Sequence, residues 1–540
     1  ANLIAAREHW DRGPAGLAWA FSEPFFGHYQ PLTWMSYQLD SWISGATPRG
    51  VHATNLALHL IASILIGLLA AQLQANLSRC PGPPPAAAGD LPGGLISGLI
   101  AGALFALHPI HVETVAWATE RRDLLSTVFV LAAVLLHLAT APADDSPSRS
   151  RGAVAALHAL AALARAQMSL PFVLLALDLW PLRRIARTHP AARTYRRQLF
   201  RLVGEKSLSI AIAGASAVAA LWAQASSGAL TSASEHGLLD RIVQTGYSLA
   251  FYPAALVYRA HWLPLHERPS PFEPLSLAYL GPALAAVAGA LLVLAVRRRA
   301  PALAVAVGCY VLLILPVAGL AQSGIQLVAE RYAYLAGAPF ILLAGCGAGH
   351  LLTRARRPVR AFVGLALCSW LGVAAVVTHR QSLVWVNDET VWRHVLAHSR
   401  SCLADNNLGQ ILLARGESGP ALLHLARALE VAPTYPRPWR ALVAVLEAPS
   451  PEGGPSRAWV AETLERAAAT QNGASQPTYA TGLAWLRAGE RGRAAERFER
   501  VLLREPNHEG ARLALARIGL APSARALSVP LSAPAAPARP

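Results

Sequence analysis

The sequence predicts an all-α protein in two parts, a polytopic membrane domain followed by a soluble α-solenoid of helical repeats. The 540-residue chain is 54% hydrophobic and only 14% charged, with a mean hydropathy of +0.35, which is too apolar for an ordinary soluble protein. Long apolar runs alternate with short arginine-rich loops, as in proteins with several membrane helices. From about residue 402, charged residues become more frequent and a helical repeat begins.

The net charge of +16 does not indicate a nucleic-acid partner. Lys206 is the only lysine, and the arginines cluster in loops between apolar runs, which is the positive-inside distribution of membrane proteins. We therefore expect no nucleic-acid binding. Three of the five cysteines fall within apolar runs, so we expect neither a disulfide framework nor a cysteine-based zinc site.

Composition divides the chain into five segments. The first is rich in tryptophan and tyrosine, which favour the membrane interface, and the last is rich in alanine, proline and serine. The predicted segments are an outer-face first loop with interfacial helices (1–50), a membrane domain of about ten spans (51–378), a connector (379–401), the repeats (402–520) and a disordered tail (521–540).

The apolar runs define the expected membrane helices, although some are shorter than the roughly 20 residues that a free-standing span needs. These runs are 51–73, 93–107, 124–141, 152–165, 168–182, 206–223, 278–296, 301–320, 335–353 and 361–378. The aromatic segment 246–263, which Pro253 is expected to break, is predicted to lie on the outer surface as an amphipathic helix instead.

Arginine distribution sets the expected topology. The loops at 183–201, 297–299 and 354–360 are rich in arginine and should face the cytoplasm. Alternating spans then place on the outer face the segments 1–50, 108–123, 224–277 and 321–334 and everything after 379. We expect an integral protein of the bacterial inner membrane with its repeats on the outer, periplasmic or extracellular, face.

The C-terminal region contains an internal repeat. The residues Gly409, Ala421, Leu425, Ala428 and Pro433 recur at the same offsets as Gly482, Ala494, Phe498, Val501 and Pro506. This spacing is typical of the tetratricopeptide helix pair, which repeats about every 34 residues. The two glycines lie 73 residues apart, which fits two units with an insertion at 449–455 in a degenerate middle repeat. Three stacked helical hairpins are therefore expected.

The most polar segment of the membrane domain, 108–123, lies between two uncharged runs, where two membrane helices must emerge into water. Ionisable clusters at this depth are candidate functional sites. The spacing of His108, His111 and Glu113 also resembles that of metal ligands. A histidine pair beside a proline serves as often to cap a helix end, so both interpretations stay open.

Several motifs, in the order in which they occur, resemble those of the TMTC-type protein O-mannosyltransferases. They are Gly27 to Tyr37, His52 to His59, His108 to Asp123, Asp178 to Leu182, Glu330 to Tyr334, and Trp385 to Trp392, which leads into the repeats. The resemblance implies a GT-C fold, a membrane glycosyltransferase whose active site faces the outer side. It also implies a lipid-phosphate-linked sugar donor, typically dolichyl- or polyprenyl-phosphate mannose, and transfer to Ser or Thr of an exported protein.

The chain departs from the family pattern in two places. Relatives begin with a membrane helix and an acidic first-loop motif that is expected to supply the catalytic base, whereas this chain starts downstream at Ala1. Asp11 and Glu23 do not match that motif, so the catalytic residue is unknown and is expected upstream of Ala1. In addition, Arg165 and Gln167 lie where many relatives have a lysine-containing turn, which puts one lipid-phosphate contact in doubt.

Transfer to a hydroxyl needs a carboxylate to take the proton and cations to stabilise the phosphate leaving group. We predict that Arg331 binds the donor phosphate with help from Arg121 and Arg122, because the guanidinium fork suits a phosphate. The surrounding outer-face cavity should be lined by His108, His111, Glu113, Asp123, Glu330, Tyr332, Tyr334, His28 and Tyr29. The alternative for Arg331 is an internal ion pair with Glu330 or Glu113.

No cofactor is assigned, the lipid-linked sugar phosphate being a substrate, and a divalent metal stays open. The expected partners are membrane lipid, a polyprenyl-phosphate sugar and an acceptor polypeptide held on the concave face of the repeats. A second hypothesis is a non-catalytic membrane scaffold whose repeats bind partner proteins. A transporter is a third, but the sequence shows no pair of Gly/Pro-broken helices in matching halves.

Overall fold

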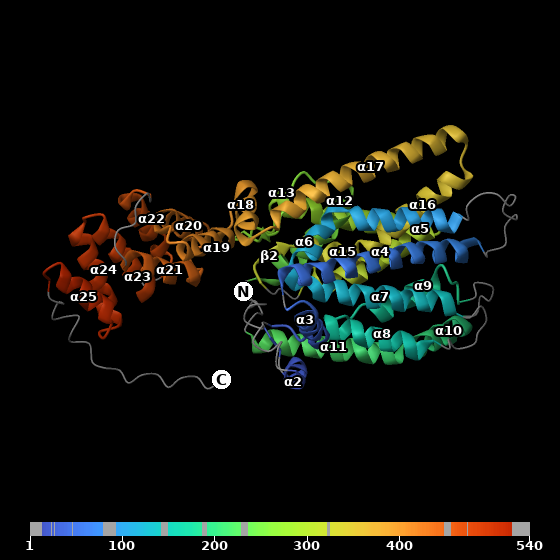
Figure 1. Ribbon diagram of the computed structural model, residues 1–540, viewed down its shortest axis with the longest axis horizontal. Helices are drawn as coiled ribbons and strands as arrows, with labels where there is room; N and C mark the ends of the chain where they lie inside the picture. The colour runs from blue at the N-terminus through green and yellow to red at the C-terminus, as the bar shows by residue number, and fades with distance from the viewer. Residues whose placement is uncertain are drawn as a thin grey trace. The chain divides into compact units, whose positions relative to one another are not determined.

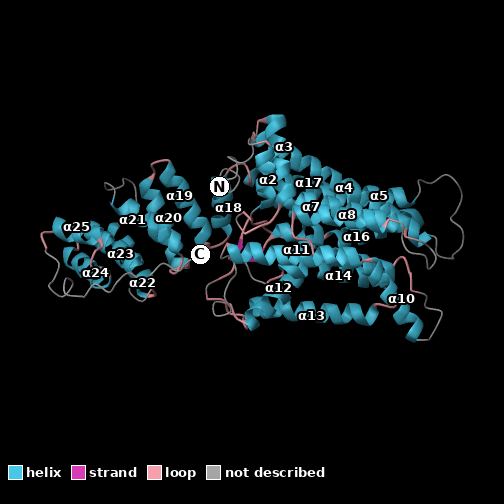
Figure 2. Cartoon of the chain, turned by 90° about the horizontal axis from the view of Figure 1, so that it is seen from below, coloured by secondary structure: helices cyan, strands magenta, loops and turns pink. Residues whose placement is uncertain are grey.

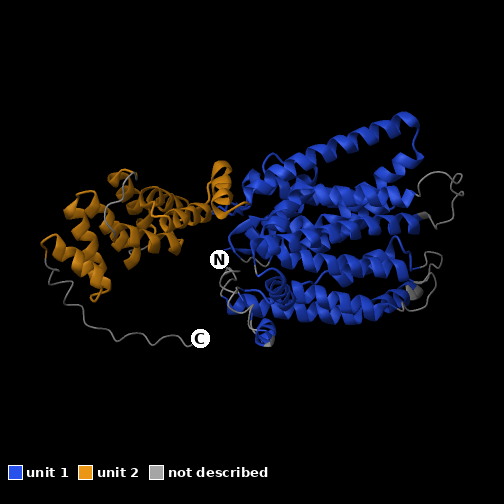
Figure 3. Ribbon diagram, in the orientation of Figure 1, with its two compact units in different colours: residues 1–385 blue, residues 386–540 orange. Residues whose placement is uncertain are grey.

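The structure is a computed structural model that describes residues 13–22, 24–25, 27–45, 47–78, 93–141, 150–185, 192–227, 236–269, 271–320, 324–447, 455–471 and 474–520. These residues are mostly helical, which confirms the all-α prediction. The strands described are β1 (His266–Glu267) and β2 (Gln326–Val328), which pair antiparallel. The chain divides into two compact units, residues 1–385 and 386–540 (Figure 3). The division falls within the predicted connector.

Unit 1 is built from long helices joined by short turns (Figure 1). The helices are α2 (Pro14–Ser22), α3 (Pro31–Ser44), α4 (Pro48–Ser78), α5 (Gly93–Leu107), α6 (Val112–Ala116), α7 (Arg121–Thr140), α8 (Arg151–Ala164), α9 (Leu170–Leu179), α10 (Ala192–Glu205), α11 (Ser207–Ser226), α12 (Leu238–Val257), α13 (Leu277–Val296), α14 (Pro301–Ile314), α15 (Ala333–Ala336), α16 (Ala338–Arg354) and α17 (Arg357–Val384). Short 3₁₀ turns lie at η2 (Pro109–His111), η3 (Ala118–Glu120), η4 (Leu315–Val317) and η5 (Glu330–Tyr332). A helix covers most of each of the ten predicted apolar runs.

Within the described residues, five helices are long and apolar enough to cross a membrane: α4, η3 with α7, α11, α13 and α17. Two bent pairs raise the number to seven if each is one span. In one, α5 meets Pro109–Ala116 at 53°, and in the other Glu330–Ala336 meets α16 at 55°. The other apolar helices, α8, α9 and Pro301–Val317, are shorter. The chain is therefore an integral membrane protein.

The segments that the sequence predicts to face the cytoplasm and those predicted to face outward lie at opposite ends of unit 1. The described parts of the three arginine-rich loops lie near α9, α10 and the turn between α16 and α17, at the right of Figure 1. Segments 108–123 and 324–334 lie toward the opposite end, near α6 and β2 (Figure 1).

Some aromatic side chains of the first loop are buried, whereas Trp42 is 58% exposed. Trp34 and Tyr37 of α3 are 4% and 1% exposed and pack with Trp19 and Phe25 in a small core, so they do not form a belt at the headgroup level. They are buried because α3 packs against α4, α7 and α8 rather than lying free on the bundle. The residues before 13 lie outside the described part of the chain.

Pro253 does not break the helix that contains it, contrary to the prediction. The helix α12 continues through Pro253, which cannot donate a hydrogen bond to the carbonyl of Leu249. That carbonyl accepts a hydrogen bond from the hydroxyl of Tyr310 at 3.0 Å instead. Because the freed acceptor has a new partner, the proline is tolerated.

Along its length, α12 contacts the outer-end loops and α13 (Figure 2). The side-chain amide of Gln244 donates to the carbonyl of Leu327 at 3.0 Å, and the hydroxyl of Ser248 donates to that of Ala318 at 3.0 Å. Among the described helices, α12 is not one of those that are long and apolar enough to cross a membrane. Its contacts fit the predicted position at the outer end, with a start at Leu238 that is earlier than expected.

Small residues let α5 pack closely against helices on two sides. A Cβ atom added to Gly98 would lie 2.7 Å from the carbonyl oxygen of Gly67 in α4. On the other side, a Cβ atom added to Gly345 of α16 would lie 2.6 Å from the Cβ of Ala101. Such contacts between small residues drive helix association in membranes, where burial of apolar surface gives little gain.

Unit 2 consists of α18 (Asp388–His398), α19 (Cys402–Ala414), α20 (Ser418–Val431), α21 (Pro436–Glu447), α22 (Arg457–Ala469), α23 (Ser475–Arg487), α24 (Arg491–Arg504) and α25 (Glu509–Arg517). The pairs α19/α20 and α23/α24 repeat the same contact. A Cβ atom on Gly409 would meet Leu425 at 2.9 Å, and one on Gly482 would meet Phe498 at 2.6 Å. The sequence repeat thus matches a structural repeat, and its tetratricopeptide identity stays a prediction. Most of the insertion at 449–455 and the tail 521–540 lie outside the described residues.

The close contact at Gly98 gives a test of the helix packing. The substitution Gly98→Ala should lower the free energy of unfolding by about 1–3 kcal/mol, because the new methyl group meets backbone that cannot move aside. Thermal unfolding in detergent micelles would measure this. The matched control is Gly289→Ala in α13, where an added Cβ has no atom within 4 Å. Equal unfolding temperatures for the two variants would contradict the packing.

Candidate functional site

The polar segment 108–123 forms a break between α5 and α7, made of η2, α6 and η3. His108 stabilises the start of this break, since its Nδ1 accepts a hydrogen bond from the backbone N–H of Ile110 at 3.2 Å. Its Nε2 lies 3.0 Å from the carbonyl oxygen of Leu256. Both ring nitrogens of His108 therefore contact backbone groups, and the helix-capping interpretation describes this residue.

His111 and Glu113 do not join His108 in a metal site. His111 is 1% exposed, and its Nδ1 lies 2.7 Å from the carbonyl oxygen of Phe105. Glu113 forms an ion pair with Arg331. Across the part of the chain that the structure describes, no group of three or more His, Cys, Asp or Glu residues could hold a metal ion. The side chains of these three residues thus have different partners.

Four arginines and four carboxylates, which we call the outer charge cluster, meet around this break. Its members are Arg122, Arg165, Arg259, Arg331, Glu113, Glu120, Asp123 and Glu330. Glu120 lies between two cations, with its Oε1 at 3.0 Å from Nη2 of Arg122 and 3.5 Å from Nε of Arg331. Buried charges in a membrane domain are tolerated only when they are paired, and here the two signs balance.

Arg331 is held mainly by Glu113. Its Nη1 lies 2.5 Å from Oε1 of Glu113, and its backbone N–H donates to Oε2 of the same carboxylate at 2.8 Å. The guanidinium also lies 5.1 Å from the ring of Trp117 and 5.0 Å from that of Tyr332. The internal ion pair that was the alternative for Arg331 is therefore present, and the side chain keeps 11% exposure.

Glu330 belongs to the same cluster through other partners. Its Oε1 accepts a hydrogen bond from the backbone N–H of Leu263 at 2.8 Å and lies 3.6 Å from Nε of Arg259. The ring of His266 lies 3.3 Å from the same oxygen. Burial, reinforced by the charge of Arg259, lowers the pKa of His266 to about 3. The imidazole is therefore neutral at physiological pH.

Arg121 lies outside the outer charge cluster, which corrects its predicted role in phosphate binding. Its guanidinium is fully buried, 2.5 Å from the carboxylate of Asp40, and donates to Oδ1 of Asn55 and the carbonyl of Val51, each at 2.8 Å. It also lies 4.3 Å from the ring of Tyr37. These contacts leave it no exposed surface for a ligand, so Arg121 joins α7 to α3 and α4.

A polar cavity of about 50 Å³ opens beside the outer charge cluster. Its polar lining includes Asp123 and Ser126 of α7, Arg165 and Gln167 of the turn after α8, and Tyr332 and Tyr334. Asp123, Tyr332 and Tyr334 were predicted to line a cavity, whereas the sequence did not assign the other three. The sequence feature that could have indicated Arg165 and Gln167 is their position, which resembles that of a lysine-containing turn in many relatives.

Arg165 is the most exposed cation of those near the polar cavity. Its side chain is 27% exposed and forms an ion pair with Asp123, whereas Arg122 and Arg331 are 16% and 11% exposed. An arginine with part of its fork free can bind an added anion while it keeps its carboxylate partner. Of these three arginines, Arg165 is the one in the lining of the polar cavity.

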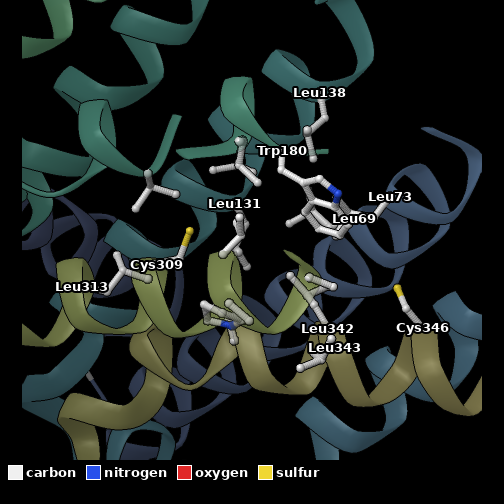
Figure 4. Close-up of a pocket in the computed structure, with 18 of the residues that line it drawn as sticks. Leu69, Leu73, Leu131, Leu138, Trp180, Cys309, Leu313, Leu342, Leu343 and Cys346 are labelled. Atoms are coloured by element: carbon white, nitrogen blue, oxygen red, sulfur yellow. The ribbon is translucent and has the colours of Figure 1, made fainter. Parts of the chain in front are cut away.

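An apolar cavity of about 140 Å³ lies beside the polar cavity, and Leu313 and Leu335 line both. Figure 4 shows leucines from several helices around it, together with Trp180. The lining comes from α4, α7, α14 and α16 and from the end of α9. A polar cavity beside an apolar one suits a ligand with a charged head and a hydrocarbon tail.

His28 and Tyr29, both predicted to line the cavity, lie in different surroundings. The charge of Arg122, followed by burial, lowers the pKa of His28 to about 3. His28 therefore sits beside the outer charge cluster as a neutral imidazole. The hydroxyl of Tyr29 instead donates to the carbonyl of Phe21 at 3.3 Å, and its ring packs against Trp222 of α11.

Several curated protein O-mannosyl-transferases are similar to the chain. Tmtc1 of Drosophila melanogaster is 37% identical over 111 residues, 21% of this chain and 11% of the relative. Human TMTC3 is 30% identical over 118 residues, 22% of this chain and 11% of the relative. F38B6.6 of Caenorhabditis elegans is 29% identical over 136 residues, 23% of this chain and 18% of the relative. These matches confirm the resemblance to TMTC-type proteins.

The matched region spans less than a fifth of the length of these relatives. No protein-family model matches the chain, and no solved structure matches it.

Arg121 gives a test of which cation is structural. Arg121→Met should lower the free energy of unfolding by about 3–5 kcal/mol, because it leaves the carboxylate of Asp40 buried without its partner. Adding Asp40→Asn should recover part of this loss. Thermal unfolding would measure both, with Arg356→Met on the exposed surface as the control. A small loss for Arg121→Met would restore it as a candidate ligand residue.

The lowered pKa of His28 predicts a dependence of stability on pH. The folded protein favours the neutral imidazole, so this stabilisation is present above pH 6.5 and is lost as the pH falls from 6.5 toward about 3. Between pH 6.5 and 5 the protein should lose at most about 1.4 kcal/mol per pH unit relative to His28→Gln. Unfolding curves at each pH would show this, and the exposed His379→Gln should keep the slope of the unsubstituted protein. If the free energy of unfolding fell equally with pH in His28→Gln and in the unsubstituted protein, the lowered pKa of His28 would be contradicted.

Proposed function

We propose that this chain belongs to a GT-C-like membrane glycosyltransferase that transfers mannose from a polyprenyl-phosphate donor to Ser or Thr of an exported polypeptide. The observation that carries the proposal is that the polar and the apolar cavity lie side by side and share Leu313 and Leu335 in their lining. The similarity to proteins named O-mannosyl-transferases supports the sugar and the reaction.

A polyprenyl-phosphate sugar has three chemically different parts, and the two cavities offer a surface for each. The apolar cavity suits the isoprenoid units next to the phosphate. The exposed part of the Arg165 fork suits the phosphate. The interior of the polar cavity, with its hydroxyls and carboxylate, suits the sugar. A free sugar nucleotide has no group that would use the apolar cavity.

We place the phosphate on Arg165 and give Arg331 and Arg122 a supporting role. Arg331 holds Glu113 with two contacts and is shared with Glu120, so most of its donors are already used. Arg165 donates to one carboxylate and is the more exposed side chain. The position of Arg165 in the turn where many relatives have a lysine is consistent with this, because either side chain would supply a cation.

We assign no catalytic base to the outer charge cluster. The four carboxylates of the outer charge cluster are each paired with an arginine. A carboxylate held in this way must leave its arginine before it can take the proton of an acceptor hydroxyl, and the arginine would then stay buried without its partner. The outer charge cluster therefore suits donor binding and leaving-group stabilisation better than removal of the acceptor's proton.

The helix pairs of unit 2 are proposed to be tetratricopeptide repeats that hold the acceptor polypeptide on the outer face of a bacterial inner membrane. Stacked repeats bury their faces against each other and leave an extended surface for a peptide. The same surface would serve a non-catalytic scaffold, so the repeats alone do not separate the two functions.

Substitution of Arg165 tests the proposed function. In the protein with its upstream sequence, Arg165→Gln should lower turnover of polyprenyl-phosphate mannose about a hundredfold, as the loss of one preorganised donor costs about 3 kcal/mol. Arg165→Lys should restore part of the activity, and Arg297→Gln at the opposite end should change little. Full activity of Arg165→Gln would show that the phosphate does not bind at Arg165. A protein that transfers no sugar from any polyprenyl phosphate would favour the scaffold.

A further inference from the structure

Two buried polar side chains of α7 face the polar cavity one helical turn apart. Asp123 and Ser126 are each 2% exposed, and both line this cavity. Residues three apart lie on the same face of a helix, so their oxygen atoms point into the same space. Neither residue lies on the side of α7 that faces lipid.

These side chains have unused hydrogen-bonding capacity. Among the described residues, the hydroxyl of Ser126 has no hydrogen-bond partner, whereas the carboxyl group of Asp123 is held by Arg165 and Glu120. The charge of Asp123 is balanced by Arg165, which forms its ion pair. Buried polar groups in folded proteins nearly always have a partner, so the hydroxyl of Ser126 beside the carboxyl group of Asp123 offers hydrogen-bonding positions to a polar ligand in this cavity.

We propose that Asp123 and Ser126 bind hydroxyl groups of the donor's sugar ring and so determine which sugar the protein uses. The inference rests on the proposed function, because it assumes a polyprenyl-phosphate sugar as the ligand. A carboxylate offers two acceptor oxygens to a pair of ring hydroxyls, and the serine hydroxyl can both donate and accept.

The chemistry of the polar cavity excludes the other parts of the donor. A phosphate placed against Asp123 would meet a like charge, whereas it can approach the exposed side of Arg165. An isoprenoid unit would leave the carboxylate of Asp123 without a partner. A cation would be repelled by Arg165. A neutral group with several hydroxyls satisfies Asp123 and Ser126 without these costs.

The size of the polar cavity limits how much of the sugar it takes. Its volume of about 50 Å³ is room for about four water molecules, at roughly 10–15 Å³ for each. We therefore expect one edge of the ring, with its hydroxyls, to enter while the anomeric carbon stays near Arg165. A site that contacts one edge of the sugar ring distinguishes sugars whose hydroxyl groups differ at that edge.

The test compares two short-chain lipids, a polyprenyl phosphate and the same lipid carrying mannose, by titration calorimetry with the full chain in detergent. The unsubstituted protein should bind the mannosylated lipid at least tenfold more tightly than the bare phosphate. Ser126→Ala should reduce this preference severalfold, and Asp123→Asn should reduce it further. Ser126→Ala should change the affinity for the bare phosphate by no more than about twofold, whereas Asp123→Asn should raise that affinity, because Asp123 then no longer repels the phosphate or shares Arg165 with it.

The matched control is Ser97→Ala, which also removes a buried hydroxyl without a described partner, but from α5, where it contacts α16. This variant should keep the full preference for mannose. Because Asp123→Asn weakens an ion pair and could prevent folding, Ser126→Ala is the deciding variant.

The outcomes separate this inference from the proposed function. If Ser126→Ala keeps the full preference for mannose, or if it lowers the affinity for both lipids equally, the sugar contact is wrong while the polyprenyl-phosphate site stands. If the unsubstituted protein binds neither lipid, the proposed function is wrong, and the inference with it. A preference that falls in Ser126→Ala but not in Ser97→Ala supports the sugar site.

Discussion

The ion pair between Arg331 and Glu113 is the interaction on which the outer end of the membrane domain depends. It joins segments 218 residues apart in the chain, each located at a break in an apolar helix. A helix break at membrane depth exposes backbone groups that lipid cannot satisfy, so it is stable only where polar groups meet it. The two breaks, bent by 53° and 55°, face each other through this pair. The outer charge cluster and the polar cavity exist because both helices are interrupted at the same end.

The opposite end of the bundle is held by a second buried cluster that has a structural role. Asp178 contacts Lys206, the only lysine of the chain, and lies 2.9 Å from Nε2 of His137, while Arg184 pairs with Glu205 at 2.7 Å. These residues come from α7, from α9 and the turn that follows it, and from α10 and the start of α11. Asp178 belongs to one of the motifs that carry the family resemblance, and its contacts explain that motif by helix packing rather than by the reaction.

The sequence predicted what local patterns determine and missed what distant contacts decide. Hydropathy located the ten apolar runs, and spacing located the equivalent glycines Gly409 and Gly482, because both signals lie within a few dozen residues. The grouping of Glu113 with Arg331 followed from the rule that buried charges must meet. Nothing in the local sequence showed that Arg121 pairs with Asp40, or that Tyr310 satisfies the carbonyl freed by Pro253. Arg165 was overlooked as a ligand residue because its turn is short and its partner Asp123 is remote in sequence.

The balance of charge in the outer charge cluster has a consequence for donor binding. Four arginines face four carboxylates, so an entering phosphate brings an anion into a site without excess positive charge. In the proposed complex Arg165 keeps its contact with Asp123 but shares its charge with the phosphate, which weakens the ion pair. The carboxylate then needs new donors in a buried cavity, and the sugar hydroxyls supply them. Phosphate and sugar thus favour each other's binding, because each removes a cost that the other would otherwise create. A lipid phosphate without a sugar leaves Asp123 with a weakened partner, which favours release of the spent donor after transfer.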